Sequence, residues 1–246
     1  MTTDELWERH AGWWQRQFTE GADPEYEEQI LPLAREWLGG FERVLEVGTG
    51  EGQVARAVTG AGAAFVVGVD PTAAQITEAA RRGGGPRYVR AGAAHLPLSD
   101  RAFDAVVACL VFEHIDEVDE AIHEVARVLH PGGRFVLFLN HPLLQTPGSG
   151  WIDDQILDPP EQYWRVGPYL SEVATVEQVE KGVHIRFVHR PLSRYVNALA
   201  DAGLVLERML EPAPPPGFVA RAPDYADAAT IPRLLVLIAR RGEPRR

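Results

Sequence analysis

The segment that decides the fold reads Val44-Leu45-Glu46-Val47-Gly48-Thr49-Gly50-Glu51-Gly52-Gln53. A short apolar strand here runs into three glycines, and a helical pattern begins at Gln53. Glycines at such a junction permit a tight turn with positive φ and let a ligand approach the backbone closely. The start of the following helix adds free N–H groups and partial positive charge. The segment therefore predicts a ligand-binding strand–turn–helix unit.

Two carboxylates flank this glycine turn. Glu46 lies two residues before Gly48, where a carboxylate suits an ammonium group better than a phosphate. Asp70 follows Gly50 by twenty residues and ends the next apolar strand, a place from which a carboxylate can bind both hydroxyls of a ribose. The pair favours an adenosine that carries an amino-acid tail. A dinucleotide fits less well, because its fingerprint would require a third glycine where this chain has Gln53.

Strands and helices alternate around this unit. Apolar strands are expected at 43–47, 64–69, 87–90, 103–110 and 134–139, with helices at 53–59, 72–82 and 117–130 between them. Continuous apolar strands are typical of a parallel sheet that is buried on both faces. Strands at 204–210 and 233–240 have no helix between them and suggest an antiparallel pair at the sheet edge. We predict the α/β class, with a doubly wound, mostly parallel, seven-stranded Rossmann-like sheet.

Two regions fall outside the alternation. Residues 1–40 carry helical patterns over 4–20 and from 23 to 38, and predict an N-terminal helical cap. Residues 140–181 are rich in aromatic residues and prolines but show little periodicity, and a strand is expected only at 183–188. A long loop in a compact domain is usually functional. We expect one structural domain, with a cap at 1–40, a cofactor-binding unit at 41–246 and a substrate-lid insertion at 140–190.

Composition excludes several classes of protein. The 246 residues are 46% hydrophobic and 24% charged, an ordinary globular mixture. The single cysteine, Cys109, excludes an intrachain disulfide and a cysteine-cluster zinc site. A net charge of −11 disfavours nucleic-acid binding. Because we find neither a signal peptide nor a membrane-length apolar run, we expect a cytoplasmic protein with no nucleic-acid partner, no membrane partner and no metal.

Four further motifs join the glycine turn. They are Asp70, Leu96–Asp100 before the fourth strand, Phe112–Ile115 after it, and Leu129–Arg134 before the fifth strand. With them the chain resembles the class I S-adenosylmethionine-dependent methyltransferases, and residues 189–212 are similar to members that act on small molecules. The resemblance implies S-adenosylmethionine as cofactor and S-adenosylhomocysteine as product. It also implies methyl transfer to an oxygen or nitrogen of a small-molecule acceptor, by a monomer or a homodimer.

The resemblance assigns cofactor roles to particular residues. Glu46 and the turn would hold the methionine moiety, Asp70 the ribose, and Pro71 and Gln75 would border the adenine. Cys109, expected to be buried and apolar rather than a nucleophile, would line the wall below the sulfonium. The full predicted cofactor set is Trp14, Glu46, Gly48, Thr49, Gly50, Gly52, Gln53, Asp70, Pro71, Gln75, Gly92, Ala93, Cys109, Leu110 and His114.

One position departs from the family pattern. Many members carry an aspartate where this chain has Gly92, and its side chain accepts a hydrogen bond from the adenine amino group. Here the backbone of Ala93, a water molecule or His95 would have to take that place. The loss of one such bond costs on the order of 1 kcal/mol, so it weakens cofactor binding modestly and does not abolish it.

Histidines are the candidate catalytic residues. His141 follows the fifth strand, where the methyl group should point, and an imidazole can deprotonate a hydroxyl or amine near neutral pH. A loop histidine bonded to backbone before Pro142 explains the residue equally well. His114 is the second candidate. The candidate substrate-binding residues are Tyr26, His141, Trp164, Tyr169 and His189.

Three alternatives remain open from the sequence. A nicotinamide-dependent oxidoreductase could use a similar sheet, although Glu46 and Gln53 oppose it. A non-catalytic regulatory protein could keep the cofactor pocket, and the departure at Gly92 is compatible with that. A protein or RNA methyltransferase is disfavoured by the acidic charge and by Ala108–Val111, which lacks an asparagine-proline-proline-tyrosine type motif.

Overall fold

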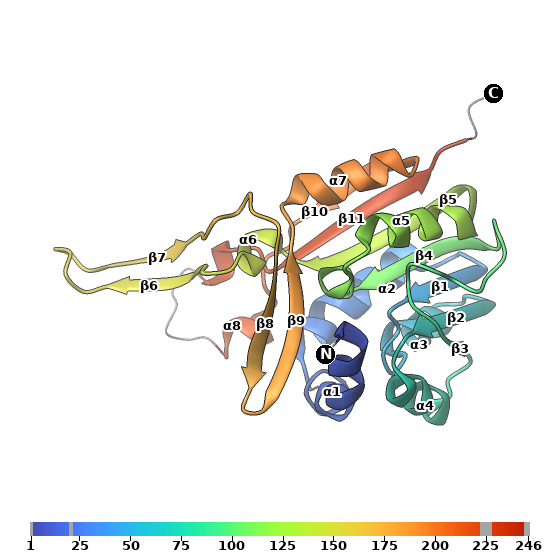
Figure 1. Ribbon diagram of the computed structural model, residues 1–246, viewed down its shortest axis with the longest axis horizontal. Coiled ribbons are helices and arrows are strands. Elements are labelled where there is room, and N and C mark those ends of the chain that lie inside the picture. The colour runs from blue at the N-terminus through green and yellow to red at the C-terminus, as the bar shows by residue number, and fades with distance from the viewer. Residues whose placement is uncertain (1, 20–21, 222–227, 244–246) are drawn as a thin grey trace.

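A seven-stranded sheet forms the centre of the computed structural model, which describes residues 2–19, 22–221 and 228–243 (Figure 1). The strand order is β10-β11-β5-β4-β1-β2-β3. The strands are β1 Arg43–Val47, β2 Phe65–Asp70, β3 Arg87–Arg90, β4 Phe103–Cys109, β5 Leu129–Asn140, β10 Leu204–Leu210 and β11 Leu234–Arg241. β11 runs antiparallel to both β5 and β10, whereas the other neighbouring pairs are parallel. The predicted fold class is confirmed.

Alternate residues of the central strands feed two separate apolar cores. Leu45 of β1 packs in a core with residues of α5 (Val118–Val128) and α7 (Leu192–Asp201). Its neighbour Val44 packs in the other core with residues of α2 (Leu31–Leu38) and α3 (Gln53–Gly60). α4 (Ala73–Arg82) joins β2 to β3. Because side chains alternate across a strand, strands apolar at every position need helices on both faces, which is why the sheet is doubly wound.

The fifth strand begins earlier than we predicted. We expected the helix at 117–130 to end at Pro131-Gly132-Gly133 and the strand to begin at Arg134. Instead the helix ends at Val128, and Leu129 already pairs with Phe103 of β4. Leu129 is fully buried, so pairing starts there, and the Pro-Gly-Gly segment forms an irregularity within the strand.

The N-terminal residues form helices beside the carboxyl ends of the strands (Figure 1). α1 spans Thr3–Gln17, and a capping box between Thr2 and Glu5 starts it. α1 contacts α4 and β9 (Val183–His189). The second predicted helix begins with a π-helical turn, Tyr26–Ile30, which continues into α2. Single π turns within helices are often found at functional sites.

Two hairpins occupy much of residues 140–190, where we expected little regular structure before 183. β6 (Gly150–Asp154) pairs with β7 (Glu161–Arg165), and β8 (Val173–Glu180) pairs with β9. The β6–β7 hairpin projects away from the body of the molecule (Figure 1). Almost all of β8 is exposed, so it carries no alternation of buried and exposed residues that a sequence pattern could reveal.

Short elements complete the described chain. They are η2 (Phe112–His114), α6 (Pro142–Gln145), α8 (Pro216–Val219) and η3 (Ala228–Thr230). Within the described ranges, no helix is both long and apolar enough to cross a membrane. Nor do those ranges contain a group of three or more His, Cys, Asp or Glu side chains that could hold a metal ion.

The turn before α3 provides a stability test. Gly52 has φ +85°, and a Cβ built on it would overlap the hydroxyl of Tyr88. We expect Gly52→Ala to lower the free energy of unfolding by about 2–4 kcal/mol, through left-handed strain and overpacking together. Urea unfolding followed by circular dichroism would measure the change.

Gly60→Ala is the matched control, because Gly60 ends the same helix with no atom near its Cβ position and no positive φ. There we expect no loss, or a gain of up to about 1 kcal/mol. Equal losses at both positions would contradict this account of Gly52.

Candidate active site

A cavity of about 610 Å³ lies at the carboxyl ends of β1, β2 and β4, and residues of α1 line one side of it. Ligands of doubly wound sheets bind at this edge. The cavity brings together most of the residues that the sequence singled out. Those that line it are Trp14, Tyr26, Glu46, Gly48, Thr49, Gly50, Gln53, Asp70, Pro71, Gln75, Gly92, Ala93, Cys109, Leu110 and His114.

The glycine turn forms one wall of the cavity. Gly48 has φ +70°, and a Cβ there would overlap the side chain of Val111. Gly50 has φ +53° and no atom closer than 3.9 Å to its Cβ position, so its backbone stays accessible. Gly52, which we assigned to the cofactor, does not line the cavity. The place that a Cβ on Gly52 would take is filled by Tyr88, so the structure gives this glycine a packing role at the start of α3.

Glu46 is buried beneath this turn. Its Oε2 accepts hydrogen bonds from Thr49 Oγ1 at 2.6 Å and from the Ala55 amide at 2.9 Å. Within the described chain, no hydrogen bond reaches Oε1. Burial raises the pKa of Glu46 to about 8, despite the two hydrogen bonds that lower it. A cation in the cavity would favour the ionised form, so this carboxyl group fits an ammonium ligand.

Asp70 joins the turns that follow β1 and β2. Its Oδ2 accepts from the Gly50 amide and its Oδ1 from the Thr72 amide, both at 2.9 Å. Burial raises the pKa of Asp70, while these hydrogen bonds oppose the shift. Each carboxylate oxygen has two lone pairs, so both can still accept from a ligand hydroxyl. The position fits the ribose of the predicted cofactor.

His114 presents a neutral imidazole to the cavity. Its Nδ1 lies 2.7 Å from the carbonyl oxygen of Arg186, so Nδ1 carries the proton and donates it. Burial lowers the pKa of His114 to about 4, which keeps the ring uncharged at neutral pH. Nε2 is therefore an acceptor, and no described residue donates to it. The rings of Trp7 and Phe187 hold the imidazole, with centroids 4.9 and 4.8 Å away.

His141 lies outside this cavity. Its Nδ1 accepts from the Leu143 amide at 3.1 Å and thereby caps α6, so Nε2 carries the proton and lies 2.8 Å from Glu211 Oε1. Both ring nitrogens are thus engaged within the fold. The interpretation as a loop histidine bonded to backbone describes this geometry, and the position does not favour His141 as a base.

Three other candidate substrate residues also lie away from the cavity lining. Tyr169 and His189 contact each other near the start of α7, where Tyr169 Oη accepts from the Leu192 amide and His189 Nε2 donates to the Tyr169 carbonyl. Trp164 lies in the projecting hairpin against Trp151. Of the predicted substrate residues outside the cofactor set, only Tyr26 lines the cavity.

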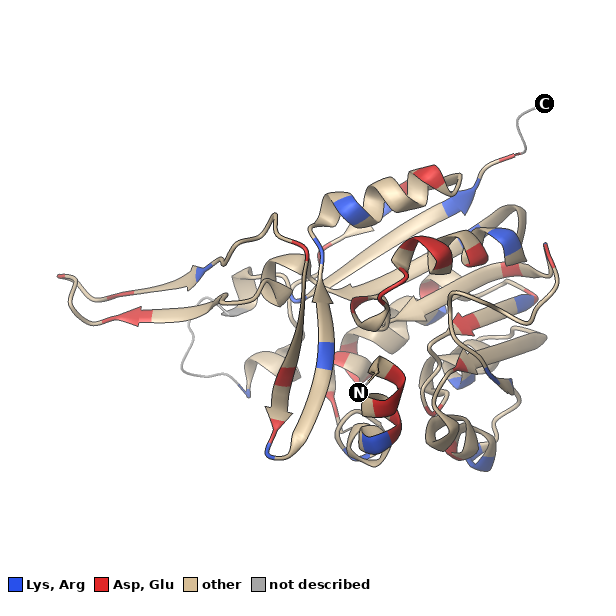
Figure 2. Ribbon diagram, in the orientation of Figure 1, with Lys and Arg blue, Asp and Glu red and all other residues tan. Residues whose placement is uncertain are grey.

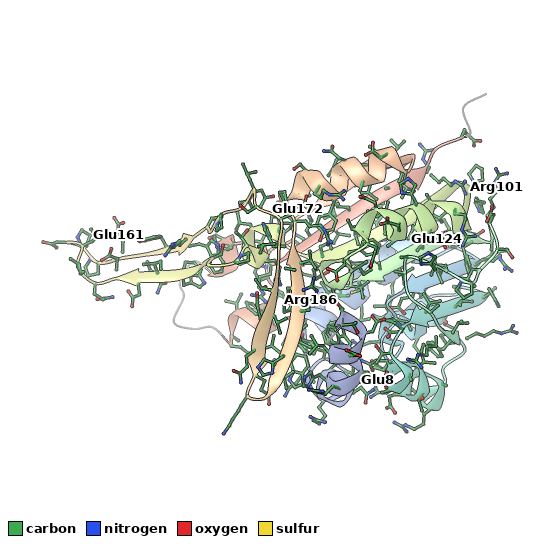
Figure 3. All side chains as sticks on the ribbon, in the orientation of Figure 1. Glu8, Arg101, Glu124, Glu161, Glu172 and Arg186 are labelled. Carbon is green, nitrogen blue, oxygen red and sulfur yellow. The ribbon has the colours of Figure 1, made fainter. Side chains whose placement is uncertain are left out.

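The cavity also contains residues that we did not predict. Trp7 lies two helical turns before Trp14 on α1, so helical spacing was an available signal. Its indole Nε1 and Thr3 Oγ1 are buried without a hydrogen-bond partner in the described structure. Such polar atoms in a cavity wall fit a ligand with polar groups of its own. Arg186 lies in β9 (Figure 3), a strand that the sequence predicted at 183–188, although its pairing with β8 was not predicted.

Comparison with known proteins agrees with this geometry. Residues 45–137 match the family described as a methyltransferase domain. A demethylmenaquinone methyltransferase from Thermus thermophilus is 36% identical over 122 residues, which are 48% of this chain and 54% of that protein. A ubiquinone/menaquinone biosynthesis C-methyltransferase from Bartonella tribocorum is 39% identical over 66 residues, 27% of this chain and 24% of the relative. The chain thus spans about half of the first relative's length and a quarter of the second's.

A solved structure covers more of the fold. The crystal structure of an S-adenosylmethionine-dependent methyltransferase from Mesorhizobium loti is 28% identical, with a TM-score of 0.71, over 85% of this chain and 96% of that one. Its likeness extends beyond the matched domain to most of the described elements. With the family match over residues 45–137, it supports the class I S-adenosylmethionine-dependent methyltransferase family that the sequence predicted.

Proposed function

We propose that this protein transfers the methyl group of S-adenosylmethionine to a small, uncharged acceptor molecule. One observation carries the proposal. A single cavity combines a buried carboxyl group for an ammonium (Glu46), a carboxylate for a ribose (Asp70) and a neutral imidazole with a free lone pair (His114). The cofactor supplies an activated methyl group, so the protein's contribution is to bind, orient and exclude water.

The charges around the cavity favour an uncharged acceptor. Its lining acidic residues are Asp4, Glu46, Glu51, Asp70, Asp116 and Glu117, of which Glu51 is paired with Arg56 and Arg82 and Glu46 becomes charged only when a cation binds. Among the described lining residues the one guanidinium is that of Arg186, which is paired with Asp116 at 2.6 Å. An acceptor with a carboxylate or phosphate would enter a field of like charge, which opposes binding.

His114 is suited to bind the acceptor molecule through the proton that the acceptor loses on methylation. Nε2 can accept a hydrogen bond from an O–H or N–H group, and the bond from Nδ1 to Arg186 fixes the direction of the ring. A neutral hydroxyl acceptor becomes strongly acidic only as its bond to the methyl carbon forms and the carbon–sulfur electron pair moves to sulfur. A weakly basic imidazole can take the proton at that late stage, because a proton transfer then runs downhill.

The methylated atom remains a prediction. We expect oxygen or nitrogen, since the proposed contact of His114 is to an O–H or N–H group. The name of the Bartonella relative makes carbon the third outcome to test. Product analysis with a hydroxypyridine distinguishes all three, because such a molecule can be methylated on oxygen, on the ring nitrogen or on a ring carbon.

Calorimetric titration with S-adenosylhomocysteine tests the proposed cofactor site. We expect binding to the purified protein, no binding of NAD, and at least tenfold weaker binding by Asp70→Asn, because the loss of charge weakens two hydrogen bonds to the ribose. The matched control is Asp104→Asn, since Asp104 also accepts from two backbone amides, at the opposite end of the sheet. We expect it to bind normally. If the folded wild-type protein did not bind the ligand, the proposed function would be wrong.

Replacement of His114 tests the acceptor side. We expect His114→Phe to lower kcat/KM by roughly 100-fold or more, the usual worth of a positioned acid–base group. Affinity for S-adenosylhomocysteine should change less than threefold. His141→Gln is the control, because His141 lies outside the cavity, and it should retain activity within about threefold. If His141→Gln lost activity and His114→Phe retained it, His141 would be the base instead.

Glu46 predicts how cofactor binding depends on pH. Its pKa of about 8 means that the free protein holds it protonated at pH 6, whereas an ammonium ligand favours the carboxylate. Binding should therefore release a proton and strengthen as pH rises from 6 towards 8, by at most tenfold per unit. In Glu46→Gln we expect weaker affinity with little pH dependence in this range. Titrations in two buffers of different ionisation enthalpy would count the proton, and a wild-type count of zero at pH 6.5 would contradict this account.

A further inference from the structure

The order of the strands indicates where the base of the cofactor must lie. The glycine turn follows β1, Asp70 ends β2, and Arg90 ends β3 at the sheet edge. A ligand with its ammonium at Glu46 and its ribose at Asp70 extends its base onwards, towards β3. The lining there is Ala91–Ala94, including Gly92, which offers no polar side chain. An adenine carries an exocyclic amino group that donates hydrogen bonds, so it needs an acceptor at this place.

Asp4 has an available carboxylate in this part of the cavity. It lies in the first turn of α1 and lines the cavity, and its carboxylate forms no hydrogen bond or ion pair with another described residue. Partial burial and the charge of Glu117 raise its pKa, while Arg90 lowers it. Asp4 in turn contributes to the raised pKa of Asp70. Asp4 shares a groove with Pro71, which follows β2, and with Arg90, which ends β3, so it lies near the ends of both strands.

The Asp4 carboxylate has no hydrogen-bond donor among the described residues, although it lies at the cavity. An acidic residue in the first turn of a helix is favoured by the helix dipole. Here, however, Glu5 already fills the capping role, because its side chain accepts from the Thr2 amide at 2.8 Å. The capping of α1 therefore does not explain why Asp4 faces the cavity.

We infer that the Asp4 carboxylate accepts a hydrogen bond from the adenine amino group, in place of the aspartate that is missing at Gly92. The inference rests on the proposed cofactor. It assigns base recognition to the covering helix rather than to the sheet. The acidic residues of α1 and of the start of α5 lie on neighbouring parts of the fold (Figure 2).

This assignment couples base recognition to the docking of α1. Glu8 on the same helix accepts from the amides of Ala73 and Ala74, at 2.7 and 3.1 Å, and so caps α4 (Figure 3). Gln15 donates to Gln75 at 2.8 Å. These contacts hold Asp4 at the cavity only while α1 is docked. The cofactor therefore completes its hydrogen bonds only when α1 covers it.

Gly92 allows the inference to be tested by relocating the carboxylate. A Cβ built there meets no atom within 4 Å, and its φ is not in the left-handed region, so Gly92→Asp can be made without strain. The ligands are S-adenosylhomocysteine and its inosine analogue, whose base carries an oxygen instead of the amino group. Their affinities, measured by calorimetry, would be compared in wild type, Asp4→Asn, Gly92→Asp and the double variant.

We expect wild type to prefer the adenosine ligand by roughly 10- to 100-fold, as for a hydrogen bond to a charged group. Asp4→Asn should lose most of that preference, because an amide can donate to the inosine oxygen. Gly92→Asp should restore it in the double variant. Glu36→Gln is the control for the loss of one charge, since Glu36 is exposed and outside the cavity, and it should behave as wild type.

Several results would overturn the inference. They are a wild type without preference, an equal loss of affinity for both ligands in Asp4→Asn, or a loss of preference in Glu117→Gln instead. A wild type that binds neither ligand would also refute the proposed cofactor. If Asp4→Asn still bound and kept the preference for the adenosine ligand, the proposed cofactor would be retained and only the role of Asp4 would be refuted. Circular dichroism of each variant would verify that the protein still folds.

Discussion

The site depends on the carboxylate of Asp70. By accepting from the amides of Gly50 and Thr72, it ties the turn after β1 to the turn after β2. Those two turns fix the opening between β1 and β2. They therefore set the distance between an ammonium group bound at Glu46 and a ribose bound at Asp70. The cost of burying a charge here is offset by two backbone donors and, in the proposed complex, by hydroxyl donors. A pocket for a nucleoside with an amino-acid tail follows from this bridge.

The sheet and the cofactor side of the site could be predicted because their signals are local. Strands such as Phe103–Cys109 are apolar at nearly every position, and only a sheet covered on both faces buries such a strand. Glu46 and Asp70 stand at strand ends next to turns, so their edge of the sheet follows from topology alone. In a parallel sheet, residues that end different strands meet at one edge, whatever their separation in sequence.

The acceptor side could not be predicted, because it depends on packing between distant segments. His114 and His141 each follow a strand, and sequence spacing does not distinguish them. Only the structure shows that Arg186, from a hairpin without a periodic signal, fixes His114, whereas α6 and Glu211 engage His141. The covering helix was predictable as amphipathic. Which of its side chains reach the cavity depends on how Glu8 seats it on α4.

The acidic lining and the neutral imidazole are consistent with a single kind of chemistry. Carboxylates around a sulfonium stabilise its positive charge before reaction and would slow a transfer that removed that charge. With an uncharged acceptor the charge is not removed, because it passes to the acceptor within the same field. An anionic acceptor would neutralise it and would meet repulsion on entry. The proton released from an uncharged acceptor then needs a nearby lone pair, and burial of His114 keeps one available by holding the imidazole neutral.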